Sequence, residues 1–189
     1  MSSAQTTTQR VPGQPDIWIF VLIESVIFGA YFIAYMIERV RAPEVFLRSQ
    51  AQLSPGYGVV NTLILLTSSW FMARSVQSAR DKKYDAASTL VLLTGASGLL
   101  FVASKVFEWW RKVADGFTFT TNEFFQFYYF LTGIHVVHVL IGFVFLGVAS
   151  YQLRGPQRRS QEIVETCATY WHMVDFLWVI IFALLYVMR

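Results

Sequence analysis

Five long apolar stretches, each nearly free of charged residues, divide the sequence. They cover residues 17–37, 57–73, 86–104, 124–153 and 166–188, and charged or turn-forming residues separate them. A helix that crosses a bilayer needs about 17–25 mostly apolar residues, and every stretch is at least that long. The pattern therefore predicts an all-α integral membrane protein, a bundle of five transmembrane helices.

Composition supports this prediction and limits the function. Of the 189 residues, 55% are hydrophobic and 14% are charged, against about 25% charged in a typical soluble protein, which excludes an ordinary soluble domain. We expect a polar N-terminal segment over residues 1–15 and one membrane domain over residues 16–189. The net charge of +3 is spread over the loops, so nucleic-acid binding is excluded.

The loops add two expectations. The linker 42–56 mixes apolar and polar residues, which predicts a short amphipathic segment at the membrane interface. The 15 Lys and Arg residues divide almost equally between the two sides of a five-span topology, so the positive-inside rule does not orient the chain.

The third stretch combines small residues with a charged exit. Gly95 and Gly98 allow close helix contact. The exit is aromatic and basic, as is typical of the membrane–water boundary, and contains Lys105, Glu108, Trp109, Trp110, Arg111 and Lys112.

Two carboxylates interrupt the apolar stretches, Glu24 in the first and Asp175 in the last. A charge at the bilayer centre costs several kcal/mol by insertion scales, on the order of 3 kcal/mol. Each carboxylate must therefore face the bundle interior, find a partner or be protonated. Both are candidate functional residues.

Histidines and a further glutamate extend this candidate set. At about 100° per residue, Glu165, His172 and Asp175 share one face of the last helix, and His135 and His138 lie three residues apart in the fourth. We expect these five side chains to satisfy one another's hydrogen bonds across the two helices. A metal site is the weaker interpretation, because the Glu-x-x-His pairs of di-iron bundles are absent from the sequence. We identify no catalytic and no metal-binding residue.

Two motifs in this region resemble subunit III of the haem–copper oxidase superfamily. One is His135-x-x-His138-Val139, with Thr132-Gly133 before it and Gly142 after it. The other combines Glu165 with the run from Tyr170 to Trp178. Glu24 looks like the buried glutamate of the family's early helix, and Glu108 looks like the acidic residue closing its next-but-one helix. We therefore add Glu108 to the candidate buried polar residues, which have a possible proton or lipid-linked role. The likeness covers residues 16–188.

The resemblance implies a small accessory subunit without redox cofactors of its own. Such a subunit packs against a catalytic membrane subunit that holds haem and metal, stabilises it within an oxidoreductase complex of the respiratory chain, and holds phospholipid. It implies a multi-pass protein of the bacterial inner membrane, with a cytoplasmic N-terminus and a periplasmic C-terminus.

The choice of partner enzyme follows from two further stretches. Residues 49–53 and 61–70 resemble the accessory branch associated with bacterial nitric oxide reductase, so we expect a role in denitrification. The alternatives are subunit III of an aerobic cytochrome c or quinol oxidase, a proton or small-solute carrier that uses Glu24 and the histidine face as a relay, and a small membrane enzyme with histidine metal ligands.

Overall fold

The computed structural model describes residues 12–155 and 159–188 as a helical bundle. From the N-terminal end, its elements are α1 (Pro15–Arg41), α2 (Pro43–Gln50), α3 (Pro55–Arg80), α4 (Tyr84–Ala114), α5 (Glu123–Arg154), α6 (Gln161–Phe182) and a π-helical turn, η1 (Ala183–Val187). Five helices are long and apolar enough to cross a membrane, and the described residues form no strand. The predicted fold class is confirmed. Most of the predicted polar N-terminal segment, residues 1–11, lies outside the described residues.

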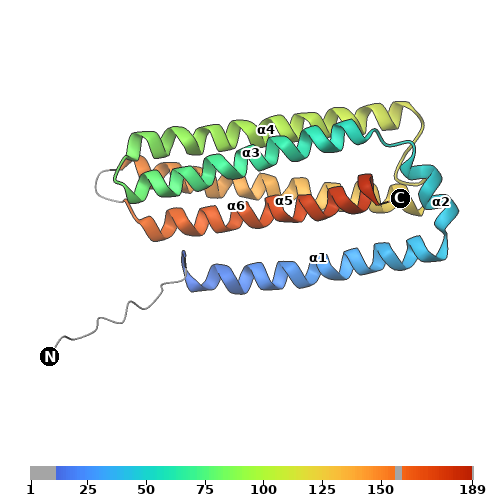
Figure 1. Cartoon of the computed structure of the whole chain (residues 1–189), viewed down its shortest axis with the longest axis horizontal. Helices are drawn as coiled ribbons and strands as arrows, with labels where there is room; N and C mark the ends of the chain where they lie inside the picture. Colours follow the sequence, from blue (N-terminus) through green and yellow to red (C-terminus); the bar gives the residue numbers. More distant parts are fainter. Residues whose placement is uncertain (1–11, 156–158, 189) are drawn as a thin grey trace.

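The long helices run alternately up and down. In Figure 1, α3, α4, α5 and α6 form one compact group, and α1 lies along its α5–α6 side. α1 begins at one end of the molecule and η1 finishes at the other, as an odd number of spans requires. α6 is the most buried of the five spans and α1 the least.

The helices extend past the apolar stretches. The connector between α3 and α4 is three residues long, 81–83, so the charged residues that separate the second and third apolar stretches are mostly helical. Likewise α4 continues through the expected boundary cluster to Ala114. The reason is that charged residues are compatible with the last turns of a helix: Arg111 and Lys112 complement the negative end of the α4 dipole.

Local sequence signals fix the helix starts. Proline occupies the first turn of α1, α2 and α3, where its missing N–H costs no hydrogen bond. The Asn122 and Ser160 side chains cap α5 and α6 by accepting from the N–H groups of Phe125 and Ile163. The predicted amphipathic segment is α2, and its Phe46 side chain is fully buried.

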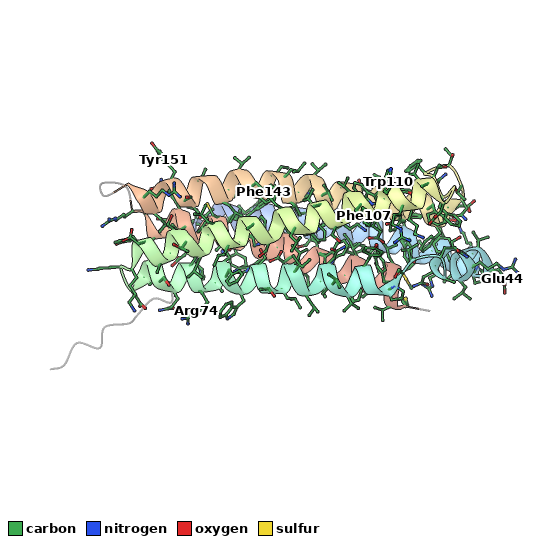
Figure 2. The ribbon with its side chains drawn as sticks, turned by 90° about the horizontal axis from the view of Figure 1, so that it is seen from above. Glu44, Arg74, Phe107, Trp110, Phe143 and Tyr151 are labelled. Carbon is green, nitrogen blue, oxygen red and sulfur yellow. The ribbon has the colours of Figure 1, made fainter. Side chains whose placement is uncertain are left out.

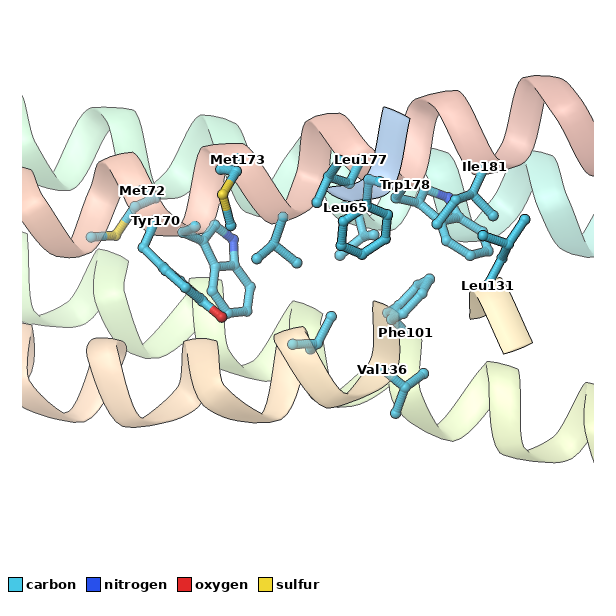
Figure 3. Close-up of a cluster of buried hydrophobic side chains, with 14 of the residues drawn as sticks. Leu65, Met72, Phe101, Leu131, Val136, Tyr170, Met173, Leu177, Trp178 and Ile181 are labelled. Atoms are coloured by element: carbon cyan, nitrogen blue, oxygen red, sulfur yellow. The ribbon is translucent and has the colours of Figure 1, made fainter. Parts of the chain in front are cut away.

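Two tryptophans of α6 organise the core (Figure 3). The Trp171 ring fills a space that only glycines leave, because a Cβ atom at Gly98 or Gly142 would lie 2.8 Å from it. Its indole N–H donates to the Ser68 hydroxyl at 3.1 Å. Trp178 donates in the same way to Thr62. Each ring thus combines close packing with a satisfied donor.

The prediction for the small residues of α4 was therefore half right. Gly98 makes the expected close helix contact, whereas a Cβ at Gly95 would meet only Leu146, at an ordinary 3.8 Å.

Candidate functional site

The most buried charges of the described chain form one cluster where α4, α5 and η1 meet. Lys105 Nζ lies 2.9 Å from Glu108 Oε2, and the two side chains are 0% and 1% exposed. The Tyr186 hydroxyl donates to Glu108 Oε1 at 2.6 Å and accepts from Lys105 Nζ at 3.0 Å. Lys105 also donates to the Tyr128 hydroxyl at 3.4 Å. We call these four residues the lysine cluster.

Every donor of the buried ammonium group has an acceptor in the lysine cluster. An ammonium group has three donors, and Lys105 directs them at Glu108, Tyr186 and Tyr128. The rings of these tyrosines and of Trp178 also lie 4.9–5.6 Å from Lys105 Nζ, a cation–π distance. A buried ion pair is tolerated only when such additional contacts compensate for desolvation.

Sequence reasoning identified part of this cluster. Glu108 was a candidate buried polar residue and is buried, whereas Lys105 was assigned only to the aromatic and basic boundary cluster and is completely buried inside the bundle. Opposite charges three residues apart share one helix face, and that spacing was the available signal. The contribution of Tyr186 could not be foreseen, because it depends on the π-helical turn that follows α6.

Glu24 faces His138 across the α1–α5 contact. Glu24 Oε2 lies 3.3 Å from His138 Nε2, and both side chains are largely buried. The other ring nitrogen, Nδ1, is 2.8 Å from the Ile134 carbonyl oxygen. A carbonyl oxygen only accepts, so Nδ1 carries a hydrogen.

The distance suits a hydrogen bond between Glu24 Oε2 and His138 Nε2. Glu24 therefore finds a partner on another helix, as its burial required.

Glu165 lies at the opposite end of the bundle from the lysine cluster and binds three segments. Its Oε1 accepts from Arg80 of α3 at 2.8 and 3.0 Å and from Gln161 at 3.0 Å. Its Oε2 accepts from the Gly13 N–H at 3.2 Å. Next to it, the Gln14 N–H donates to the Thr166 hydroxyl at 2.9 Å. Glu165 thus joins the start of α1 to α3 and α6.

Of the remaining predicted residues, His135 and Asp175 are buried and His172 is half-buried. His172 Nδ1 lies 2.7 Å from the Ser69 hydroxyl oxygen of α3. The His135 ring packs against Phe101 and Trp178, with centroids 5.5 and 5.3 Å away. Asp175 is 4% exposed, and neither its carboxylate oxygens nor the His135 nitrogens have a hydrogen-bond partner among the described residues.

The expected hydrogen-bond network among five of these residues is therefore wrong. His135, His138, Glu165, His172 and Asp175 make no hydrogen bond to one another within the described chain, and three of them bind residues of other helices instead. Spacing along a helix predicts a shared face correctly, but it does not identify the partner across the interface.

The described residues include no group of three or more His, Cys, Asp or Glu side chains that could hold a metal ion. Each histidine has a local environment of its own: His138 faces Glu24, His172 faces Ser69, and His135 is enclosed by aromatic rings. The chemistry that this arrangement supports is charge pairing inside a membrane bundle.

Comparison with known proteins identifies relatives over nearly the whole chain. Residues 12–189 match the family described as cytochrome c oxidase subunit III. Cytochrome c oxidase subunit 3 of Synechocystis sp. is 30% identical over 93% of this chain and 78% of that protein. The haem–copper oxidase subunit I+III of Aeropyrum pernix is 30% identical over 89% of this chain and 22% of that protein. Cytochrome bo(3) ubiquinol oxidase subunit 3 of Buchnera aphidicola is 23% identical over 90% of this chain and 83% of that protein.

The lysine cluster predicts a strongly non-additive double-mutant cycle. Glu108→Leu leaves the Lys105 ammonium buried without its counter-charge, and we expect a loss of about 3–5 kcal/mol in the free energy of unfolding. Lys105→Met/Glu108→Leu removes both charges and should recover most of that loss. Denaturant titration of the purified protein in detergent micelles measures both effects.

The matched control is the exposed pair Arg48–Glu44, where Glu44→Gln should cost less than about 1 kcal/mol. The single variant Lys105→Met completes the cycle. If the double variant loses as much unfolding free energy as Lys105→Met and Glu108→Leu lose in sum, Lys105 and Glu108 do not act as one buried pair.

The Glu24–His138 contact predicts that shape and hydrogen-bonding capacity matter more than charge. The amide of Glu24→Gln can donate to His138 Nε2, so its unfolding free energy should stay within about 1 kcal/mol of the wild type. Glu24→Leu leaves Nε2 without a partner and should cost about 1–3 kcal/mol. Equal stability of the two variants, measured by the same titration, would refute a role for this contact.

Proposed function

The chain belongs to the cytochrome c oxidase subunit III family, and we propose from this that it is a non-catalytic accessory subunit of a haem–copper enzyme. In this role it packs beside a catalytic membrane subunit and stabilises it. The observation that carries the proposal is that charged groups of the interior pair with side chains of this same chain, as Lys105 pairs with Glu108 and Glu24 with His138. The Glu24–His138 contact joins α1 to α5, and the Lys105–Glu108 pair of α4 binds the hydroxyls of Tyr128 in α5 and Tyr186 in η1.

We propose that haem and metal are held by the partner subunit. The three histidine rings of the described chain contact different residues: His172 contacts Ser69, His138 contacts the Ile134 carbonyl, and His135 contacts Phe101. The name of the Aeropyrum relative joins subunits I and III in one chain, which supports an intimate contact between this family and a subunit I.

For the partner enzyme we propose an oxygen-reducing oxidase. The relatives described above carry the names of cytochrome c or ubiquinol oxidase subunits, and this favours the aerobic alternative over the nitric oxide reductase that residues 49–53 and 61–70 had suggested. Nitric oxide reductase remains the second candidate, supported by those two stretches alone.

The five long apolar helices are those of a multi-pass membrane protein. We propose the bacterial inner membrane as its location, with the start of α1 on the cytoplasmic side and the end of η1 on the periplasmic side. In this orientation the Arg80–Glu165 contact lies at the cytoplasmic end and the lysine cluster toward the periplasmic end.

An affinity tag at the C-terminus tests the proposal. The tagged protein is purified from its own host membranes in mild detergent, and an untagged strain is the control. We expect a haem absorption spectrum in the eluate, together with oxygen consumption when reduced cytochrome c or a quinol is supplied. Nitric oxide consumption without oxygen consumption would replace the oxidase by the second candidate. An eluate without haem would overturn the accessory role.

A further inference from the structure

Asp175 is the candidate acid of the bundle that lacks a partner. The other candidate acids each face a basic side chain, in the contacts Glu24–His138, Glu108–Lys105 and Glu165–Arg80. Asp175 is 4% exposed. Over residues 12–155 and 159–188 it forms no ion pair, and its two carboxylate oxygens have no hydrogen-bond partner. A buried polar group in this situation requires an explanation.

Asp175 lies deep in the membrane. It follows Glu165 by ten residues on α6, which is about 15 Å at a rise of about 1.5 Å per residue. This depth is half of the roughly 30 Å hydrocarbon core. An ionised carboxylate without a counter-charge is strongly disfavoured there, whereas a neutral carboxyl group is tolerated. The position therefore favours an Asp175 side chain that carries a proton.

Within the described chain, no charge on a neighbouring element replaces that proton. The titratable groups that face α6 have contacts of their own: Glu24 of α1 with His138 of α5, Tyr35 of α1 with the Leu184 carbonyl, Arg80 of α3 with Glu165, Tyr186 of η1 with Glu108, and His135 of α5 with the rings of Phe101 and Trp178. Figure 2 shows the other cation of α3, Arg74, on the outer edge of the bundle.

A pocket of about 220 Å³ connects the Glu165 end of the bundle with His172. Arg80 and Gln77 of α3 and Glu165, Thr169 and His172 of α6 line it. The three α6 residues are spaced by four and three positions, so they share one face of the helix. A pocket of this volume with polar lining has room for several water molecules. Water can thus reach the His172 ring, seven residues along α6 from Glu165.

Ser69 of α3 lies between His172 and Asp175. His172 Nδ1 is 2.7 Å from the Ser69 hydroxyl oxygen. The Ser69 hydroxyl also lies next to the Asp175 carboxyl group, outside hydrogen-bond geometry. Asp175 itself is three residues after His172, on the same side of α6. A row of three side chains therefore leads from the pocket to the buried acid.

We propose that Asp175 is a proton-binding site inside the membrane and that His172 and Ser69 connect it to the Glu165 end of the bundle. A hydronium ion in the pocket gives its proton to His172 Nε2 and becomes water. The ring passes the hydrogen of Nδ1 to the Ser69 oxygen, and Ser69, after rotation of its side chain, passes its own hydrogen to Asp175. The carboxylate becomes a neutral carboxyl group, and the same steps in reverse release the proton.

Infrared spectroscopy of the full chain in detergent micelles tests the site at neutral pH. A protonated carboxyl group has a C=O band that a carboxylate lacks. Labelling with ¹³C-aspartate should shift such a band, and it identifies Asp175, because the exposed Asp16, Asp81, Asp85 and Asp115 are ionised at this pH. Asp175→Asn keeps the shape of the neutral acid and should remove the band. Absence of a labelled band would overturn the proposal, because Asp175 would then be ionised.

Transfer into D₂O tests the route. The band moves as deuterium replaces the carboxyl hydrogen, and the rate of this replacement is measured. A positioned proton-transfer group contributes at least about 100-fold, so His172→Leu and Ser69→Ala should each slow the replacement about 100-fold while the band itself stays.

Two variants serve as matched controls. His135→Leu removes a buried histidine outside the route, and Ser75→Ala removes a hydroxyl of α3 that donates to the Ala87 carbonyl oxygen. Both should exchange at the wild-type rate. Unchanged exchange in His172→Leu, or equal slowing in His172→Leu and His135→Leu, would overturn the route, because the proton would then reach Asp175 through general opening of the bundle. The readout is a band of this chain, so it does not depend on the partner enzyme.

Discussion

The neutralisation of charge inside a membrane bundle is the constraint on which this structure depends. Lys105 is completely buried, and the structure is possible because Glu108 lies 2.9 Å away and two tyrosine hydroxyls complete the shell of the ammonium group. These four residues come from α4, α5 and η1. The ends of three segments are therefore fixed by a single set of short contacts. Because these contacts are buried, the loss of one partner destabilises the fold strongly.

The same constraint explains how α1 is attached. It buries little of its surface, and it is fixed to the bundle by polar contacts at three levels. Glu165 binds Gly13 just before the helix, His138 faces Glu24 within it, and the Tyr35 hydroxyl donates to the Leu184 carbonyl oxygen at 3.1 Å. α1 is thus held at defined points, while much of its apolar surface remains available to lipid or to a neighbouring subunit.

The fold could be predicted from the sequence because the bilayer leaves few solutions: five apolar stretches free of most charges can only become five spanning helices. The partners of the polar residues could not. Lys105 sits among aromatic and basic residues, a composition shared by membrane boundaries and by buried cation sites. The apolar stretch around Glu24 predicted that this residue needs a partner, and helical spacing placed Glu165 and His172 on one face of α6. Their partners His138, Arg80 and Ser69 come from other helices, and no local pattern encodes that pairing.

The central claim is that the buried polar groups of this chain support assembly and do not take part in the reaction. The most direct test replaces Lys105 by Met in the native host and measures two quantities, the yield of assembled haem-containing complex and the turnover per haem in what assembles. A structural role predicts a several-fold lower yield with turnover per haem unchanged. A normal yield combined with a loss of turnover per haem would contradict the claim, because the lysine cluster would then act on the reaction itself.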